Sequence, residues 1–132
     1  MSSAAPGKLA KAVEALCFVP TEAQRLFAHP CTQWLFEFSA GPLGFGAKIV
    51  NASGFQAINT AVGPFRVITQ TYCVMDRLTA FLHWRDRQCY DQAIWMAQSQ
   101  VIDWADLETW AANEGMPEHE WQMFFQTAKQ VT

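Results

Sequence analysis

The spacing of the apolar residues changes near residue 70, and this change limits the fold more than any motif does. After this point the apolar residues recur every three or four positions, which is typical of helices with one buried face. Before it they occur in short alternating runs, such as 32–38, between glycines and prolines, which is typical of strands. The sequence therefore predicts an α+β fold, with N-terminal helices, a small antiparallel sheet of about three strands and a C-terminal cluster of about four helices.

The individual elements follow from these patterns and from the residues that interrupt them. A helix is expected over 7–17, and a second, short helix over 21–28, between Pro20 and Pro30 and capped by Thr21. Alternation and turn residues predict the strands 32–38, 47–50, 55–59 and 64–69, of which the last two form a hairpin. Four C-terminal helices are expected: one capped by Thr71, one from about Arg87, one capped by Asp103, and one that begins at Pro117 as its first residue.

Composition favours one folded domain over all 132 residues, since 51% of them are hydrophobic and only 16% are charged. No apolar run reaches the roughly 20 residues that cross a membrane, and the first residues lack a signal-peptide pattern, so we expect a cytoplasmic protein. The net charge of −3 argues against a broad nucleic-acid-binding surface but allows a local basic pocket. The cysteines form no C-x-x-C pair, so we expect buried free thiols and no metal site: Cys17, Cys31, Cys73 and Cys89.

One segment at a junction of two predicted helices is dense in charge and reads DRLTAFLHWRDRQCYDQA from Asp76 to Ala93. It resembles the C-terminal region of nucleotidyltransferase-like proteins of the abortive-infection type, which carry a D-R-L…H-W-x-D-R-Q…D-Q-A pattern. The matching positions are Asp76, Arg77, Leu78, His83, Trp84, Asp86, Arg87, Gln88, Asp91, Gln92 and Ala93. Weaker likenesses flank the segment, in the turn Gly41-Pro42-Leu43 with Gly46 and in Trp110 with Glu114-Gly115.

The resemblance implies an active site that this chain does not complete. The family needs a G-[GS] turn followed by a D-x-D pair, whose carboxylates hold the metal ions at the triphosphate, and the sequence contains no D-x-D. By the resemblance, the chain begins where the helix after that motif would begin. Met75 stands where many members have a lysine. Glu37 falls at the position of the third carboxylate, where it is either a metal ligand or an outward-facing strand residue.

The candidate ligand-binding residues are charged side chains of this segment together with the strand glutamate: Glu37, Asp76, Arg77, His83, Arg85, Asp86, Arg87 and Asp91. Arg85 and Arg87 either face a phosphate or belong to a structural network, in which Arg87 pairs with Asp91 to fix the helix junction. His83 follows Asp76 by seven residues on one side of a helix. The two residues either exchange a proton, or His83 is a hydrogen-bonded structural residue.

Three hypotheses for the function remain open at this point. The first is a stand-alone, catalytically incomplete nucleotidyltransferase-like module without a cofactor. It would bind a protein partner, or a nucleotide or RNA end, through a cleft beside Asp76, Arg77, Arg85 and Arg87. The second is an active enzyme, dependent on a divalent cation, with a rearranged site of Glu37, Asp76 and Asp86. The third is a purely structural, antitoxin-like interaction domain.

The resemblance also implies that the first two strands of the family's sheet are absent. A sheet shortened in this way has an open edge and uncovered apolar surface, which favours a homodimer or an unidentified protein partner. The candidate interface residues are aromatic side chains of one strand and of the last helix: Trp34, Phe36, Phe38, Trp121 and Phe125.

Overall fold

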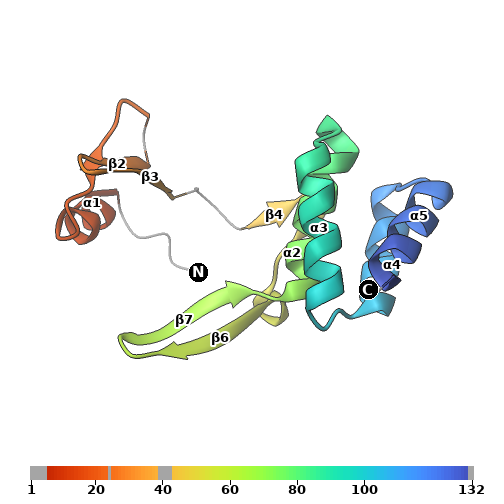
Figure 1. Ribbon diagram of the computed structural model, residues 1–132. Helices are drawn as coiled ribbons and strands as arrows, with labels where there is room; N and C mark the ends of the chain where they lie inside the picture. The colour runs from red at the N-terminus through yellow and green to blue at the C-terminus, as the bar shows by residue number, and fades with distance from the viewer. Residues whose placement is uncertain (1–5, 24, 39–42, 131–132) are drawn as a thin grey trace. The chain divides into compact units, whose positions relative to one another are not determined.

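A computed structural model describes residues 6–23, 25–38 and 43–130 and divides the chain into two compact units, Met1–Pro42 and Leu43–Thr132 (Figure 1). Within these ranges it contains helices and small antiparallel sheets of two or three strands, so the α+β prediction is confirmed. The strands form three separate sheets rather than one, because each strand pairs only with its neighbour along the chain. The predicted turn at Gly41-Pro42 lies outside the described residues.

The first unit is a helix followed by a three-stranded antiparallel sheet. Helix α1 (Pro6–Glu14) ends before the predicted residue 17, and the exposed Leu16 and Cys17 lie beyond it. The strands β1 (Val19–Pro20), β2 (Leu26–His29) and β3 (Thr32–Glu37) follow in the order β1-β2-β3. The buried Phe27 of β2 lies opposite Phe36 of β3, which gives this small sheet its apolar centre.

The helix predicted over 21–28 is wrong, because this segment contains a turn and the strand β2. The Thr21 backbone N–H and hydroxyl both donate to the Leu26 carbonyl, with distances of 3.1 and 3.0 Å, so Thr21 closes a turn instead of capping a helix. Arg25 has a φ of 70°, which no helix residue adopts. A segment this short between two prolines is also below the length at which a helix nucleates well.

The second unit begins with two hairpins. Strands β4 (Gly44–Phe45) and β5 (Lys48–Ile49) form a short one, and a 3-10 turn at Ala52–Gly54 leads to the hairpin of β6 (Phe55–Thr60) and β7 (Gly63–Ile68). The second hairpin confirms the predicted pairing of 55–59 with 64–69, with bounds shifted by one residue. Its register pairs Phe55 with Ile68 at one end and Thr60 with Gly63 at the other. Phe55 and Ile68 pack against the core of this unit, and Figure 1 shows the rest of the hairpin extending away from the helices.

Four helices complete the second unit: α2 (Gln70–Trp84), α3 (Arg87–Ser99), α4 (Trp104–Glu114) and α5 (Glu118–Lys129). The cap of α2 is Thr69 and not the predicted Thr71; the Thr69 hydroxyl accepts from the Tyr72 N–H at 3.3 Å. Thr71 is buried and accepts from the Asp103 N–H at 2.9 Å, so it links α2 to the start of α4. Pro117 precedes α5 by one residue instead of being its first.

The core of the second unit lies between these helices and confirms the predicted stripes. The largest fully buried side chains are Phe124, Met75, Leu78, Leu107 and Val74. Trp104 contacts Phe124 and Phe125 with ring centroids 6.2 and 5.2 Å apart. Trp121 is buried and Phe125 is partly buried in this cluster, so neither residue offers the free surface that an interface requires. Among the described residues, no helix has the length and apolar character to cross a bilayer.

Candidate functional site

A groove of about 500 Å³ runs between α2 and α3, which are joined by a tight turn at Arg85-Asp86. Arg85 adopts the left-handed conformation, with a φ of 53°, and its N–H donates to the Phe81 carbonyl, so the chain reverses within two residues. The two helices therefore lie side by side over most of their length (Figure 1). The groove is lined by one face of each helix and by the residue after α3: Cys73, Asp76, Arg77, Gln92, Trp95, Met96, Ser99 and Gln100.

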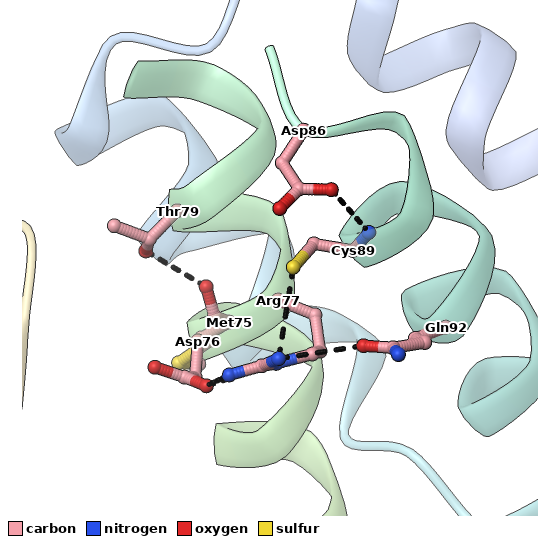
Figure 2. A network of polar contacts seen from close by, with 7 residues as sticks. All are labelled: Met75, Asp76, Arg77, Thr79, Asp86, Cys89 and Gln92. Atoms are coloured by element: carbon pink, nitrogen blue, oxygen red, sulfur yellow. Dashed lines mark hydrogen bonds and ion pairs between the residues drawn. The ribbon is translucent and has the colours of Figure 1, made fainter. Parts of the chain in front are cut away.

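Arg77 holds the polar side of this groove together (Figure 2). Its Nε donates to Asp76 Oδ2 at 3.0 Å, and its Nη2 donates to the same oxygen. Its Nη1 donates across to α3, to Gln92 Oε1 at 3.3 Å and to Cys89 Sγ at 3.6 Å. The hydrogen bond to Asp76 raises the pKa of Arg77 above its ordinary value. The guanidinium group is thus held by residues of both helices.

The charges of this network cancel, while hydrogen-bonding groups remain at the groove. Asp76 and Arg77 are half-buried and form an ion pair, so their side of the groove carries no net charge. Both bonds from Arg77 end on Asp76 Oδ2, which leaves Oδ1 as an acceptor within the described contacts. Gln92 receives its bond on Oε1, so its amide N–H groups remain donors. The network therefore offers an acceptor and donors without offering a free charge.

The rest of the groove lining includes an exposed tryptophan, together with the polar Ser99 and Gln100. Trp95 is 64% exposed and lies on the α3 face that also carries the half-buried Met96. Cys73 lies across from them on α2, and burial raises the pKa of its thiol, so the thiol is neutral near pH 7. An exposed indole beside a polar network provides a stacking surface next to hydrogen-bonding groups, which is how aromatic residues hold flat ligands.

Two of the predicted ligand residues are occupied at the ends of helices. Asp86 is the N-cap of α3, and its Oδ1 accepts from the Cys89 N–H at 3.1 Å; these bonds lower the pKa of Asp86. Arg85 lies over the Phe81 ring and pairs with Glu120 of α5, with distances of 3.4 Å (Nη1 to Oε2) and 2.5 Å (Nη2 to Oε1). The sequence interpretation did not foresee Glu120, which lies 35 residues away in the chain.

The remaining predicted pairs differ from their expected arrangement. Arg87 pairs with Asp91 at 3.5 Å, but both residues belong to α3 and reach solvent, so this pair does not fix the helix junction. His83 Nε2 lies 3.2 Å from Glu114 Oε1, whereas Asp76 bonds Arg77. The structure therefore assigns His83 and Asp76 to different contacts. This geometry agrees with the structural interpretation of His83.

Glu114 makes a second polar cluster, which joins α4 to the first hairpin of the unit. Its side chain is 6% exposed and accepts from the Ala47 N–H at 3.3 Å (Oε1) and 3.1 Å (Oε2), in addition to its contact with His83. Gly46 has a φ of 58°, and a Cβ atom there would lie 1.8 Å from Glu114 Oε1. These contacts give Gly46 and Glu114 a structural role in positioning the β4–β5 turn.

Glu37 ends β3 in the first unit and is exposed, whereas the other candidates belong to the second unit. Across the described ranges, no group of three histidine, cysteine, aspartate or glutamate side chains is arranged to hold a metal ion. The expectation of buried thiols is correct only for Cys89; Cys17 and Cys31 are exposed, and Cys73 is half-buried.

Sequence reasoning missed the groove residues that follow Gln92 on α3. Trp95, Met96 and Ser99 follow Gln92 at helical spacing, so the sequence shows that they share a face of α3. That this face meets Cys73 and Arg77 depends on the packing of α3 against α2, which no local pattern specifies. Comparison of the chain with protein-family models, with curated proteins and with solved structures found no match.

Proposed function

We propose that this chain is a non-catalytic binding module whose α2–α3 groove holds the base of a nucleotide or of an RNA end. The observation that carries the proposal is the exposed Trp95 beside the fixed network of Asp76, Arg77 and Gln92. A nucleobase has a flat face that stacks on an indole and an edge that presents hydrogen-bond donors and acceptors. The groove offers one partner for each of these features.

The charge of the groove favours a base over a phosphate. A phosphate site needs cationic donors that are not already neutralised. Here Asp76 compensates Arg77, Glu120 compensates Arg85, and Asp91 pairs with Arg87. A neutral heterocycle avoids the repulsion that Asp76 would exert on an anion. Because the free Asp76 Oδ1 accepts hydrogen bonds, the preferred base presents N–H groups on its edge, as guanine does.

Calorimetric titration with guanosine, guanosine monophosphate, uridine and inorganic phosphate tests this proposal. We expect both guanine compounds to bind with similar affinity, uridine to bind more weakly, and inorganic phosphate neither to bind nor to compete. Trp95→Ala removes the stacking surface and weakens binding about 5- to 150-fold. The matched control is Trp84→Ala, because Trp84 is also a highly exposed tryptophan, at 75%, but does not line the groove. Competition by phosphate, or equal losses in the two variants, contradicts the proposal.

The proposal includes no transfer chemistry. Arg77 neutralises Asp76 and would repel a cation there, and Asp86 caps the start of α3, so the two do not form the pair of free carboxylates that holds the cations of phosphoryl transfer. We expect no labelled product when the protein is incubated with labelled nucleoside triphosphates, RNA, and magnesium or manganese. Label transfer that Asp76→Asn abolishes would instead support the hypothesis of a rearranged active site.

A further inference from the structure

Strand β3 forms an edge of the sheet in the first unit and carries large apolar side chains. Within the described part of the first unit its one strand neighbour is β2, and every residue of β3 is exposed. Three consecutive residues, Trp34, Leu35 and Phe36, are 73%, 56% and 43% exposed. An edge strand of this kind presents unpaired backbone groups between two apolar faces, which natural proteins normally cover or blunt.

The hydrogen bonds to β2 show which backbone groups of β3 point outward. The Phe38 N–H donates to the Arg25 carbonyl at 2.9 Å, and Phe36 lies opposite Phe27 two residues further along the ladder. Hydrogen-bonded pairs alternate with non-bonded pairs in an antiparallel ladder, so the backbone groups of Phe36 face β2, as those of Phe38 do. The backbone groups of Leu35 and Glu37 therefore face away from β2 and form the open edge.

We infer that a second copy of this chain pairs with this edge, antiparallel, with the two-fold axis at Leu35. Leu35 then lies opposite the second copy's Leu35, and the outward-facing backbone groups of both strands bond one another. The same register puts Trp34 opposite the second copy's Phe36, and Gln33 opposite its Glu37. The Trp34 N–H is already bound by Thr32 Oγ1 at 3.2 Å and is not required for this pairing.

The side chains of β3 suit its own copy in this register. Alternation along the strand puts Trp34 and Phe36 on one face, so two aromatic pairs form across the axis, where side chains of a non-bonded pair lie closest. Leu35 occupies the other face together with Gln33 and Glu37. The single charged residue of β3, Glu37, meets an amide and lies far from the second copy's Glu37. A parallel pairing in register would place the two carboxylates side by side and is disfavoured.

This pairing joins the two three-stranded sheets into one continuous sheet with a closed two-fold interface. An isologous contact satisfies both edges at once and cannot propagate, so it predicts a dimer and no larger assembly. The arrangement is independent of the groove between α2 and α3, and the proposal for the groove does not depend on it.

Light scattering coupled to size-exclusion chromatography tests the dimer. We expect about twice the 14.9 kDa mass of one chain at micromolar concentration. Leu35→Lys places two ammonium groups against each other on the axis and should give the mass of one chain. Val62→Lys is the control, because Val62 is also an exposed apolar residue and lies at the tip of the β6–β7 hairpin, away from β3 in the sequence. Circular dichroism shows whether each variant retains its fold.

Charge changes at Gln33 then test the register. Gln33→Lys places a cation opposite the second copy's Glu37 at two symmetric positions and should strengthen dimerisation about 2- to 30-fold at low salt. Gln33→Glu creates two like-charge pairs and should weaken it by a similar factor. Adding Glu37→Lys to Gln33→Glu restores opposite charges and should restore the dimer.

Several results would overturn the inference. One is the mass of a single chain for the unmodified protein at 100 micromolar or above, because a dissociation constant above roughly 100 micromolar is weak for a specific dimer. Another is a dimer that Val62→Lys dissociates and Leu35→Lys does not. A dimer that is insensitive to both charge changes at Gln33 would show that the copies meet elsewhere. A monomer that binds a peptide copy of β3 but does not self-associate would assign the edge to another protein's strand.

Discussion

At the scale of single residues, the three arginines of the charged segment have three different roles. Arg77 holds the polar side of the groove, and Arg85 ties the α2–α3 turn to α5. Arg87 pairs with Asp91 of its own helix and lies 4.6 Å above the Tyr90 ring. All three lie in the same charged segment of the sequence, and the local pattern does not tell their partners apart. Their roles differ because the partners Gln92 and Glu120 are brought to two of them by helix packing.

The pairing of Arg85 with Glu120 makes a prediction about acid stability. The hydrogen bond from Arg85 lowers the pKa of Glu120 below its ordinary value of 4.5. A carboxylate whose pKa is lower in the folded state stabilises the fold above its unfolded pKa, and this contribution is lost as the pH falls through the folded pKa. Arg85→Gln should therefore lower the unfolding midpoint at pH 7 and flatten its decline below about pH 4.5.

Arg87→Gln is the control for this experiment, because its ion pair with Asp91 is exposed and belongs to one helix. We expect Arg87→Gln to change the free energy of unfolding by less than about 1 kcal/mol at pH 7, within the range of exposed pairs. Thermal unfolding of both variants between pH 7 and pH 3 measures the effect. An Arg85→Gln profile parallel to that of the unmodified protein would show that Glu120 is not coupled to Arg85.

At the scale of elements, long periodic segments were predictable and short ones depended on their surroundings. The apolar stripe of α2 includes Val74 and Leu78, which are both fully buried. This stripe was predictable because a helix of about four turns repeats its apolar spacing often enough to identify it. The segment at β2 is too short for such a repeat, and its pairing with β3 makes it a strand instead of the predicted helix. The cap of α2 was misplaced because Thr69 and Thr71 are chemically equivalent, and only the fold assigns Thr71 to Asp103.

The contact of the β4–β5 turn with Glu114 predicts an unequal response of two glycines to alanine. Gly46→Ala forces a side chain into the left-handed region, at a φ of 58°, and drives its Cβ against the Glu114 carboxylate. Gly115→Ala meets the same backbone restriction, at a φ of 82°, but has no atom within 4 Å of the added Cβ. We expect Gly115→Ala to lower the free energy of unfolding by about 1–2 kcal/mol and Gly46→Ala by roughly 2–5 kcal/mol.

Chemical denaturation of the two glycine variants measures this difference. Gly46→Ala should also change the environment of His83. The added methyl group displaces the Glu114 carboxylate, which His83 also contacts. Equal losses in the two variants would mean that Glu114 moves aside at little cost, and that its contacts with Ala47 and His83 are not restrictive.

At the scale of the whole molecule, the two units differ in how much apolar surface they bury. In the second unit, buried residues from α2 to α5 form one cluster that includes the side chains with no exposure at all. In the first unit, the buried apolar residues among those described are Val13 and Phe27. A segment of about 40 residues with so few buried side chains gains little stability from its own core. The composition of the full chain does not show this difference, because it averages the two units.

This difference predicts where backbone amides exchange with solvent and how exchange depends on protein concentration. Exchange requires local opening, and the free energy of opening follows the burial around each element. We expect the amides of α2 and α3 to exchange slowly at every concentration, because their core is internal to one chain. The outward-facing amides of β3, at Leu35 and Glu37, gain hydrogen-bond partners in the dimer. Their exchange should therefore slow as the protein concentration rises from about 1 to 100 micromolar, a range that spans the dissociation constant of a dimer with micromolar affinity. Hydrogen–deuterium exchange read by mass spectrometry on the peptide covering 32–38 measures this, with a peptide from α3 as internal reference.

The variant Leu35→Lys is the control for this measurement. In Leu35→Lys the β3 peptide should exchange rapidly at both concentrations while the α3 peptide remains protected. Protection of β3 that is strong at 1 micromolar and independent of concentration would mean that a contact within one chain, and not a second copy, covers this edge.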